Sequence, residues 1–449
     1  MSDSTNPYTI TVETTEPWQR VIKVGVPRAE YDKQYQQLLT AAVRNHQRPG
    51  FRKGKTPRGI VERELGGRLR AEAFEQLVPQ AYRAAVVEHR LTPINEPELE
   101  NLVFEDDKDI SFDLRVEVRP EVQARDFEGL QVKERAVEIG DTEVNEVLER
   151  LRDSRAFFEK VDRPAAEGDQ VVLDLAPRAD DGAVEEDRGL KAQRLIVGEE
   201  QNLPDFNTGL VGVEAGQTPD ITVSYPDDYP NAGMAGRTVT FACAIDSVRV
   251  KVVPEADDAF ASQLQEGQTL LELRTRIREG LEDEARKRVA QELDEQILDQ
   301  LISRNDAPVP PSMVEAWIRS GLQDLQHRNQ QMGRPVTEEQ QQTYREAAKP
   351  VAERQIAGMF LLESVRRQQE IEVTDEEIEE KIASVAAENG FDVEKYREYV
   401  NQGEERDRLR HGLEERKTYD FLLSRAEVTP VAADADLSGD KPAAAEDQG

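Results

Sequence analysis

The chain has 449 residues, which suggests about three domains at roughly 150 residues each. Its 91 acidic residues outnumber 58 basic ones, giving a formal charge of −33. No stretch approaches the roughly 18 to 20 apolar residues that a bilayer helix needs, so the sequence predicts no membrane span. The first residues lack the basic-then-apolar pattern of a signal peptide, so we expect a cytoplasmic protein.

The chemistry-bearing residues exclude several classes of enzyme. Cys243 is the only cysteine, and the four histidines are scattered along the chain. No H-E-x-x-H, G-x-S-x-G or P-loop pattern occurs. We therefore expect no metal and no cofactor, and the acidic total argues against a protein that coats nucleic acid with its whole surface.

Residues 1–120 differ from the rest in charge. They contain 18 basic and 19 acidic residues, whereas residues 121–449 carry a net charge of −32. Period-two alternation at Trp18, Ile22, Val24 and Val26 predicts a strand. Pro27 then begins a helix, a second helix follows a loop, and 102–104 with 110–118 predict a closing hairpin. The pattern predicts one small α+β domain.

The middle of the chain changes pattern twice. Residues 121–162 predict a connector with a helix at about 141–158, with Asp141 or Thr142 as its N-cap. Short alternating strands between turns predict a β-rich module over 163–252.

Residues 253–430 are predicted to be almost wholly helical. Capping-box patterns begin at Thr269, Ser312, Thr337 and Thr374. The helix after Thr269 carries apolar residues every four positions from 273 to 301, a stripe that winds around the helix axis. Such a helix meets different neighbours along its length. Pro350 is expected to kink or break a later helix, and the acidic tail, 431–449, is predicted to be disordered.

The loop RPGFRKGKTP, residues 48–57, is the sharpest feature of the sequence. No acidic residue occurs between Lys33 and Val61, and the basic residues of this span are Lys33, Arg44, Arg48, Arg52, Lys53, Lys55 and Arg58. Lys and Arg attract phosphate backbone, and an aromatic tip at Phe51 suits an RNA–protein surface. The alternative is a solvated loop with Phe51 packed into the core.

Residues 50–57 resemble the ribosome-docking signature of bacterial trigger factors. Further similarity lies in VPEADDAFASQL from Val253, TLLELRTRIREGLEDEARKR from Thr269 and PVPPSMVEAWI from Pro308, and so spans nearly the whole chain. The resemblance implies docking near the exit tunnel of the large ribosomal subunit, on rRNA and ribosomal protein. The residues it implies for docking are Gly50, Phe51, Arg52, Lys53, Gly54 and Lys55. It also implies a helical domain with arms that hold nascent and unfolded polypeptides, an elongated multidomain architecture, and roles in protein transport and cell division.

The middle module resembles the FKBP-type prolyl isomerases. The matching landmarks are Glu167-Gly168-Asp169, Leu203-Pro204-Asp205-Phe206, Gly209 to Gly216 and Tyr225 to Tyr229. By resemblance Leu175, Leu203, Phe206, Tyr229 and Phe241 line an apolar prolyl pocket. Leu175 stands where the family has an aromatic, Asp205 where it has glycine and Asn207 where it has an acid. These departures predict a weakened or reshaped pocket, and ordinary core positions remain the alternative for Phe206 and Tyr229.

Two functions of different classes follow. The leading prediction is a ribosome-associated, ATP-independent chaperone that holds new polypeptides in a folding- or export-competent state and carries an isomerase module. The alternative is primarily a prolyl isomerase that acts on folding clients off the ribosome. Client-binding candidates are Met313, Trp317, Met359 and Phe360, because Met and aromatics make adaptable contacts, although helix–helix packing explains them equally well. A homodimer off the ribosome stays open.

Overall fold

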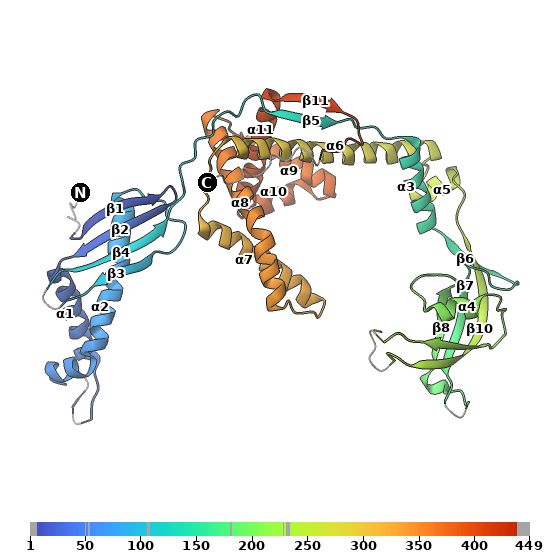
Figure 1. Ribbon diagram of the computed structural model, residues 1–449, viewed down its shortest axis with the longest axis horizontal. Helices are drawn as coiled ribbons and strands as arrows, with labels where there is room; N and C mark the ends of the chain where they lie inside the picture. Colours follow the sequence, from blue (N-terminus) through green and yellow to red (C-terminus); the bar gives the residue numbers. More distant parts are fainter. Residues whose placement is uncertain are drawn as a thin grey trace, which may run out of the picture. The chain divides into compact units, whose positions relative to one another are not determined.

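The structure is a computed structural model that describes residues 7–49, 51–52, 54–105, 108–179, 182–227, 229 and 234–437. The chain forms two compact units, one of residues 1–135 with 290–449 and one of residues 136–289. Each contains its own sheets and helices (Figure 1). The predicted α+β class is confirmed, with an α+β N-terminal region, a β-rich middle module and a helical C-terminal region. The finer predicted boundaries stay predictions.

The N-terminal region pairs one antiparallel sheet with two helices. The sheet order is β1 (Thr9–Glu16), β2 (Gln19–Val26), β4 (Ile110–Glu117) and β3 (Glu98–Val103). Alternate residues of β2 and β4 are buried, as the period-two pattern predicts. Strand β1 was not predicted, since its threonine-rich sequence leaves most side chains exposed and has weak apolar alternation. Trp18 lies just before β2 and is only half-buried.

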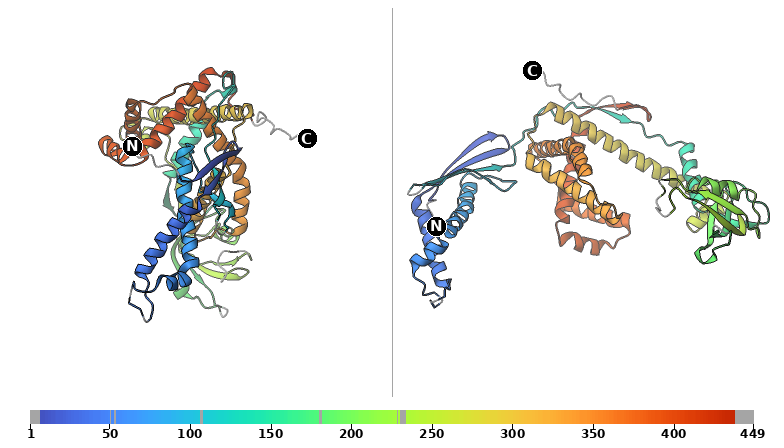
Figure 2. Two further views of the ribbon diagram at one scale, coloured as in Figure 1. Left: turned by 90° about the vertical axis from the view of Figure 1, so that its left-hand side faces the viewer. Right: turned by 60° about the horizontal axis from the view of Figure 1, so that its bottom comes forward.

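Helices α1 (Arg28–Asn45) and α2 (Arg58–Glu88) form an antiparallel pair against this sheet. Tyr31, Tyr35 and Leu39 of α1 are buried at helical spacing, as predicted, and join one core with the buried face of α2. The loop between the helices lies at the end of the pair away from the sheet (Figures 1 and 2). Two helices that share one core therefore carry the basic loop.

The middle unit is built on a five-stranded antiparallel sheet. Strand β10 (Thr238–Val252) pairs with β6 (Phe157–Val161), β7 (Gln170–Pro177) and β9 (Asp220–Ser224), and β8 (Leu190–Ile196) pairs with β7. The short helices of this unit are α4 (Pro204–Leu210), α5 (Asp258–Leu264) and the 3₁₀ turn η1 (Glu186–Arg188).

The predicted helix over 141–158 is too long. Helix α3 is Asp141–Ser154, its N-cap is Gly140, and Phe157 already pairs with Val252 of β10. A tertiary strand pairing thus ends the helix, which helical spacing within the segment could not show.

The C-terminal region contains six helices within the described residues. They are α6 (Leu270–Arg304), α7 (Pro311–Gln331), α8 (Glu338–Gln368), α9 (Asp375–Asn389), α10 (Val393–Asn401) and α11 (Glu405–Arg425). Strand β11 (Glu427–Val431) follows and pairs in parallel with β5 (Gln131–Arg135). The predicted disordered tail therefore begins inside a strand, and residues 438–449 lie outside the described residues.

Several helix signals can be checked directly. The capping boxes at Thr337 and Thr374 are confirmed, and Thr269 exchanges the same reciprocal bonds with Glu272. The prediction at Ser312 is wrong, because Pro310 is the N-cap and Pro311 already begins the helix. The expected break at Pro350 is also wrong, because α8 continues through this residue.

The apolar stripe of α6 is buried at its two ends. Leu273 packs with Leu148 and Phe260 in one core, while Leu293, Ile297 and Leu301 are buried near the other end. The stripe residues between them are only half-buried. The helix thus supplies side chains to different neighbours along its length.

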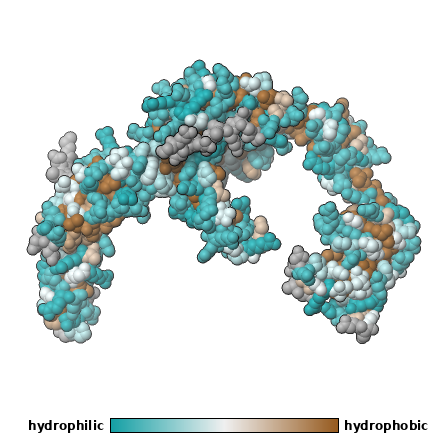
Figure 3. All heavy atoms as spheres, in the orientation of Figure 1, coloured by the Kyte–Doolittle hydropathy of each residue, from teal (hydrophilic) through white to brown (hydrophobic). Residues whose placement is uncertain are grey.

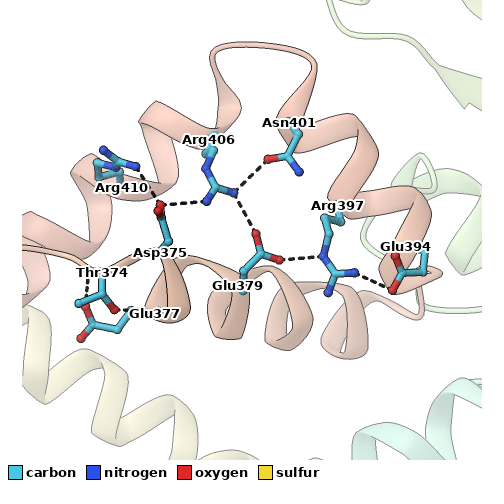
Figure 4. A network of polar contacts seen from close by, with 9 residues as sticks. All are labelled: Thr374, Asp375, Glu377, Glu379, Glu394, Arg397, Asn401, Arg406 and Arg410. Carbon is cyan, nitrogen blue, oxygen red and sulfur yellow. Dashed lines mark hydrogen bonds and ion pairs between the residues drawn. The ribbon is translucent and has the colours of Figure 1, made fainter.

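Ion pairs tie α9, α10 and α11 together over a small apolar core (Figure 4). Arg406 contacts Asp375 at 3.1 Å and Glu379 at 3.0 Å, and Arg397 contacts Glu379 at 2.7 Å. Bonds from Arg406 and then Arg397 hold the pKa of Glu379 below its usual range. A carboxyl with a lowered pKa stabilises the fold as its anion, and this contribution is lost as the pH falls through the lowered value.

Candidate functional site

The basic loop between α1 and α2 has a defined backbone. The Gly54 N–H donates to the His46 carbonyl at 3.2 Å, which closes the loop at its base. Within it, Phe51 N–H donates to the Arg48 carbonyl and Lys55 N–H to the Arg52 carbonyl. Gly54 has a φ of +74°, and a Cβ there would lie 2.8 Å from the Arg44 carbonyl oxygen. Glycine is therefore required at this position.

Basic residues at the base of the loop contact an acidic residue, whereas those described at its tip do not. Glu64 of α2 contacts Arg48 at 2.6 Å and His46 Nε2 at 3.1 Å. Arg52 and Lys55 are exposed, and within the described part of the chain neither has an ion-pair partner. Their charge is thus available to an external polyanion.

Phe51 is 40% exposed. The alternative, in which this ring packs into the core, is therefore wrong. Of the six docking candidates, Phe51, Arg52, Gly54 and Lys55 are brought together in the loop. Gly50 and Lys53 lie outside the described residues.

The β-rich module gathers four of the five predicted pocket residues around one apolar cluster. Leu175 and Phe206 are buried in it, and Leu203 and Phe241 are half-buried against it. The Phe206 and Phe241 ring centroids lie 5.8 Å apart. Tyr229 is half-buried and contacts the Tyr225 ring at 4.8 Å between centroids. Leu175, Leu203, Phe206 and Phe241 therefore belong to the module's own core, whereas Tyr229 adjoins it through Tyr225.

Tyr225 is a neighbour of this cluster that the sequence did not single out as a pocket residue. Its ring packs against the cluster and lies beside Tyr229. The one sequence signal for Tyr225 as a pocket neighbour was its position at the start of the Tyr225 to Tyr229 landmark.

The residues that depart from the FKBP-type pattern have structural partners. The Asp205 carboxylate accepts the Ser224 N–H at 2.7 Å, which fixes the start of α4 beside β9. Asn207 Oδ1 accepts from Gly198 N–H at 3.0 Å, and its Nδ2 donates to the Glu199 carbonyl at 2.9 Å. These substitutions brace the turn that leads to Phe206, so they position the aromatic ring.

The acid of the Glu167-Gly168-Asp169 landmark is also structural. Asp169 is 3% exposed and receives both guanidinium nitrogens of Arg163, at 2.6 and 3.0 Å. Burial works to raise the pKa of Asp169, but the bonds from Arg163 and Ala166 N–H outweigh it and hold the pKa low. A paired carboxylate of this kind closes the loop before β7 and is not a proton donor near neutral pH.

The client-binding candidates on the helices divide into two groups. Trp317 of α7 and Met359 of α8 are 38% and 41% exposed, and Met313 is half-buried. Phe360 is 3% exposed and lies beneath the Arg119 guanidinium, 5.5 Å from the ring centroid. Phe360 is therefore a core residue in this fold and offers no surface to a client.

Met359 lies at a cavity of about 420 Å³ between α6, α8 and α11. Leu298, Leu362 and Tyr419 supply apolar lining, and Arg366 and Glu414 lie at its charged side. The surface of the helical region is otherwise mostly hydrophilic on the face seen in Figure 3.

An exposed aromatic group at α10 was not predicted. Phe391 and Tyr399 are 55% and 62% exposed, and both contact the Tyr396 ring. The rings alternate with charged residues in the sequence, so that only the folded helix brings them to one surface.

Comparisons with known proteins agree with this architecture. Three family models match, "Bacterial trigger factor protein (TF)" over residues 8–151, "FKBP-type peptidyl-prolyl cis-trans isomerase" over 161–246 and "Bacterial trigger factor protein (TF) C-terminus" over 269–424. The chain is thus a chaperone of several domains with an FKBP-type peptidyl-prolyl isomerase domain between the other two.

Curated relatives extend the match along the chain. The trigger factor of Halothermothrix orenii is 31% identical over 412 residues, covering 90% of this chain and 95% of the relative. That of Syntrophotalea carbinolica is 30% identical, covering 92% and 94%. The chain belongs to the trigger factor family.

A solved structure of the trigger factor chaperone aligns at 20% identity with a TM-score of 0.47, covering 92% of this chain and 99% of that one. Among the described residues, no helix is long and apolar enough to cross a membrane.

We predict that Cys243 reports on opening of the isomerase domain. The thiol is fully buried on β10, opposite Leu175, and burial raises its pKa to about 11. Compared with a thiol of ordinary pKa, its thiolate is about 100-fold rarer at a pH near 8, in addition to being inaccessible. Iodoacetamide should modify the native chain negligibly and the urea-unfolded chain readily, as measured by mass spectrometry.

Because the sequence contains a single cysteine, any modification is assigned without ambiguity, and a Cys243→Ser variant gives the background. Rapid modification of the native chain would contradict the buried position.

Proposed function

We propose that the chain is a ribosome-associated, ATP-independent chaperone of the cytoplasm that holds newly synthesised polypeptides in an open state. The observation that carries this proposal is the basic loop at the end of the α1–α2 pair. It presents Phe51 beside Arg52 and Lys55 in a near-neutral region of a strongly acidic chain. We place the docking partner at the large ribosomal subunit near the exit tunnel, as in the resemblance described above.

The loop suits docking on an RNA–protein surface. Its backbone is closed by Gly54, so little conformational entropy is lost when Phe51 inserts into a pocket. Arg52 and Lys55 release counterions from phosphates when they bind, which makes the contact sensitive to salt. Because Glu64 neutralises Arg48 at the base, attraction is concentrated at the exposed tip.

Holding a client needs no nucleotide in this proposal. Covering apolar residues of an unfolded chain is favourable by roughly 25 cal/mol per Å². Trp317, Met359 and the exposed rings of Phe391 and Tyr399 offer such contacts, and they lie on three different helices or their ends. Separate small patches favour weak, exchangeable holding of many sequences over tight binding of one.

Isomerisation of X-Pro bonds needs neither a nucleophile nor a cofactor. The barrier of about 18 to 20 kcal/mol reflects conjugation of the amide, which the twisted transition state loses. An apolar pocket favours that less polar state by differential binding. We assign this pocket to Leu203, Phe206, Tyr229 and Phe241, with Leu175 beneath it.

Replacing Phe51, Arg52 and Lys55 by Ala should weaken co-sedimentation with ribosomes by about ten-fold or more and reduce its salt dependence, because phosphate contacts and the aromatic anchor are lost. The matched control is Arg83→Ala, an exposed arginine elsewhere on α2. The readout is a binding curve from pelleting assays at several KCl concentrations.

Unchanged ribosome binding by the triple variant would contradict the assignment of these residues to docking. If the isomerase activity persisted in that case, the alternative of a prolyl isomerase acting off the ribosome would be favoured.

For the isomerase pocket the sharper substitution is Phe241→Leu. Phe206→Ala removes a core side chain and should cost about 3 to 5 kcal/mol of stability. A lower rate in that variant could therefore reflect unfolding as well as loss of the pocket. Phe241→Leu keeps apolar volume but removes the ring beside Phe206, so we expect the cis-to-trans rate on a Phe-Pro peptide to fall about ten-fold. Phe157→Leu, an exposed phenylalanine of the same sheet, should leave the rate unchanged. Equal rates for the two variants would remove Phe241 from the pocket.

The holding surface is tested by light scattering of an unfolded client without nucleotide. Wild-type chain should suppress aggregation equally with and without ATP. The variant Trp317→Ser with Met359→Ser and Tyr399→Ser should require about ten-fold more chaperone, because apolar contact area is lost. Leu271→Ser, at an apolar residue of α6 that is 74% exposed, serves as the control. A dependence on ATP, or equal suppression by variant and control, would contradict the proposal.

A further inference from the structure

Residues 124–135, which follow the N-terminal region, form a segment that we call the strap. Side chains of other elements bind its backbone. Asn305 accepts from Arg125 N–H at 2.7 Å and donates to the Arg125 carbonyl at 2.9 Å. Gln296 does the same to Lys133, at 2.8 and 3.0 Å. Gln300 accepts from Gln131 N–H at 3.0 Å and donates to its carbonyl.

Each of these carboxamides therefore replaces one residue of a neighbouring strand, because it satisfies both the N–H and the C=O of one strap residue. The spacing explains how a helix can do this. Gln296 and Gln300 lie one turn apart on α6, a rise of about 6 Å. Their partners Lys133 and Gln131 lie two residues apart in a strand, about 6.6 Å. The two side chains form a ladder that matches the repeat of an extended backbone.

Further contacts continue the same recognition along the strap. Arg304, the next position of the ladder, donates to the carbonyls of Asp126, Glu128 and Gly129. At the start of the strap, Ser364 of α8 accepts from Ala124 N–H at 2.9 Å, and Gln368 donates to the Ala124 carbonyl. All these contacts are to main-chain atoms of the strap.

The other edge of the strap is bound by β11, which pairs in parallel with β5. The inward side chains of the strap are apolar, with Ala124, Leu130 and Val132 buried, while Gln131 and Glu134 point to solvent. A groove of about 620 Å³ runs beside the ladder and β11. The site thus accepts an extended backbone with an apolar residue at alternate positions.

We propose that Gln296, Gln300 and Asn305, together with β11, form a binding track for extended polypeptide with alternating apolar residues, and that the strap is its occupant in cis. The unfolded segments of a client have this chemistry, so the use of the track in the cell rests on the proposed chaperone function. The strap competes with any such segment. Releasing it therefore increases the apparent affinity of the track.

The test releases the strap by substitutions in the strap alone, so that the residues of the track are unchanged. In the full chain, Gln131→Pro with Lys133→Pro removes the strap N–H groups that Gln300 and Gln296 accept. The probe is a short fluorescein-labelled peptide of alternating Val and Ser, followed by fluorescence anisotropy. The strap variant should bind it about ten-fold more tightly than the wild type, since a bound competitor is removed. Hydrogen exchange at Val132 and Glu134 verifies that the strap has been released.

Three controls make the outcome specific. Adding Gln296→Ala and Gln300→Ala to the strap variant should abolish the gain, whereas adding Gln291→Ala, an exposed glutamine of α6, should preserve it. The same peptide N-methylated at alternate residues should bind weakly, because it lacks donors.

A released strap without a gain in affinity overturns the proposal, and so does a gain that survives loss of both ladder glutamines. A strap that stays protected despite both prolines shows that the ladder does not hold it, and overturns the proposal as well.

Failure here is distinguishable from failure of the proposed function. The docking proposal is tested at Phe51, Arg52 and Lys55, and the holding proposal at Trp317, Met359 and Tyr399. None of these six residues lies in the strap or supplies one of the hydrogen bonds to it described above.

Discussion

The backbone of the strap must find hydrogen-bond partners, and this requirement organises the larger compact unit. A chain segment that leaves one domain without entering a helix or a full sheet carries polar groups that are costly to bury unpaired. Here α6, α8 and β11 supply the partners. Because β11 follows the last helix, the final residues of that region bind the segment directly after the N-terminal domain. The unit is consequently discontinuous in sequence, combining residues 1–135 with 290–449.

In the isomerase domain, residues that depart from the FKBP-type pattern still hold the backbone in place. Asp205 and Asn207 look like losses when read against the FKBP-type pattern, yet each anchors a backbone group around α4. Gly209 adds a further constraint, since a Cβ there would lie 2.9 Å from Ile221. The geometry that holds Phe206 against Phe241 therefore depends on different residues from those the motif names, while the two rings stay in contact.

Local signals in the sequence were sufficient where local physics decides the structure. The spacing of Tyr31, Tyr35 and Leu39, the turn at Gly54 in the basic loop and the capping boxes at Thr337 and Thr374 all correspond to what the structure shows. Long-range pairing could not be seen in this way. Phe157 reads as the end of a helix but belongs to a strand because Val252 pairs with it. Gln296 and Gln300 have the sequence pattern of solvated helix surface, since their partners lie far away in sequence. Phe360 and Met359 are neighbours that sequence alone does not distinguish, yet Phe360 is buried and Met359 is exposed.

Net charge alone describes this chain poorly, because its charges differ in what they contact. In the helical region, acidic residues such as Asp375 and Glu379 are paired with Arg406 and Arg397, so these carboxylates are not free surface charges. In the loop between α1 and α2 the order is reversed, since an acid at the base neutralises Arg48 while Arg52 and Lys55 keep their charge at the exposed tip. A polyanion approaching a chain of net charge −33 is repelled at long range. Within a Debye length of about 8 Å, however, it meets mainly the local charge. Arg52 and Lys55, which have no ion-pair partner among the described residues, therefore make the tip of this loop locally basic on a strongly acidic protein.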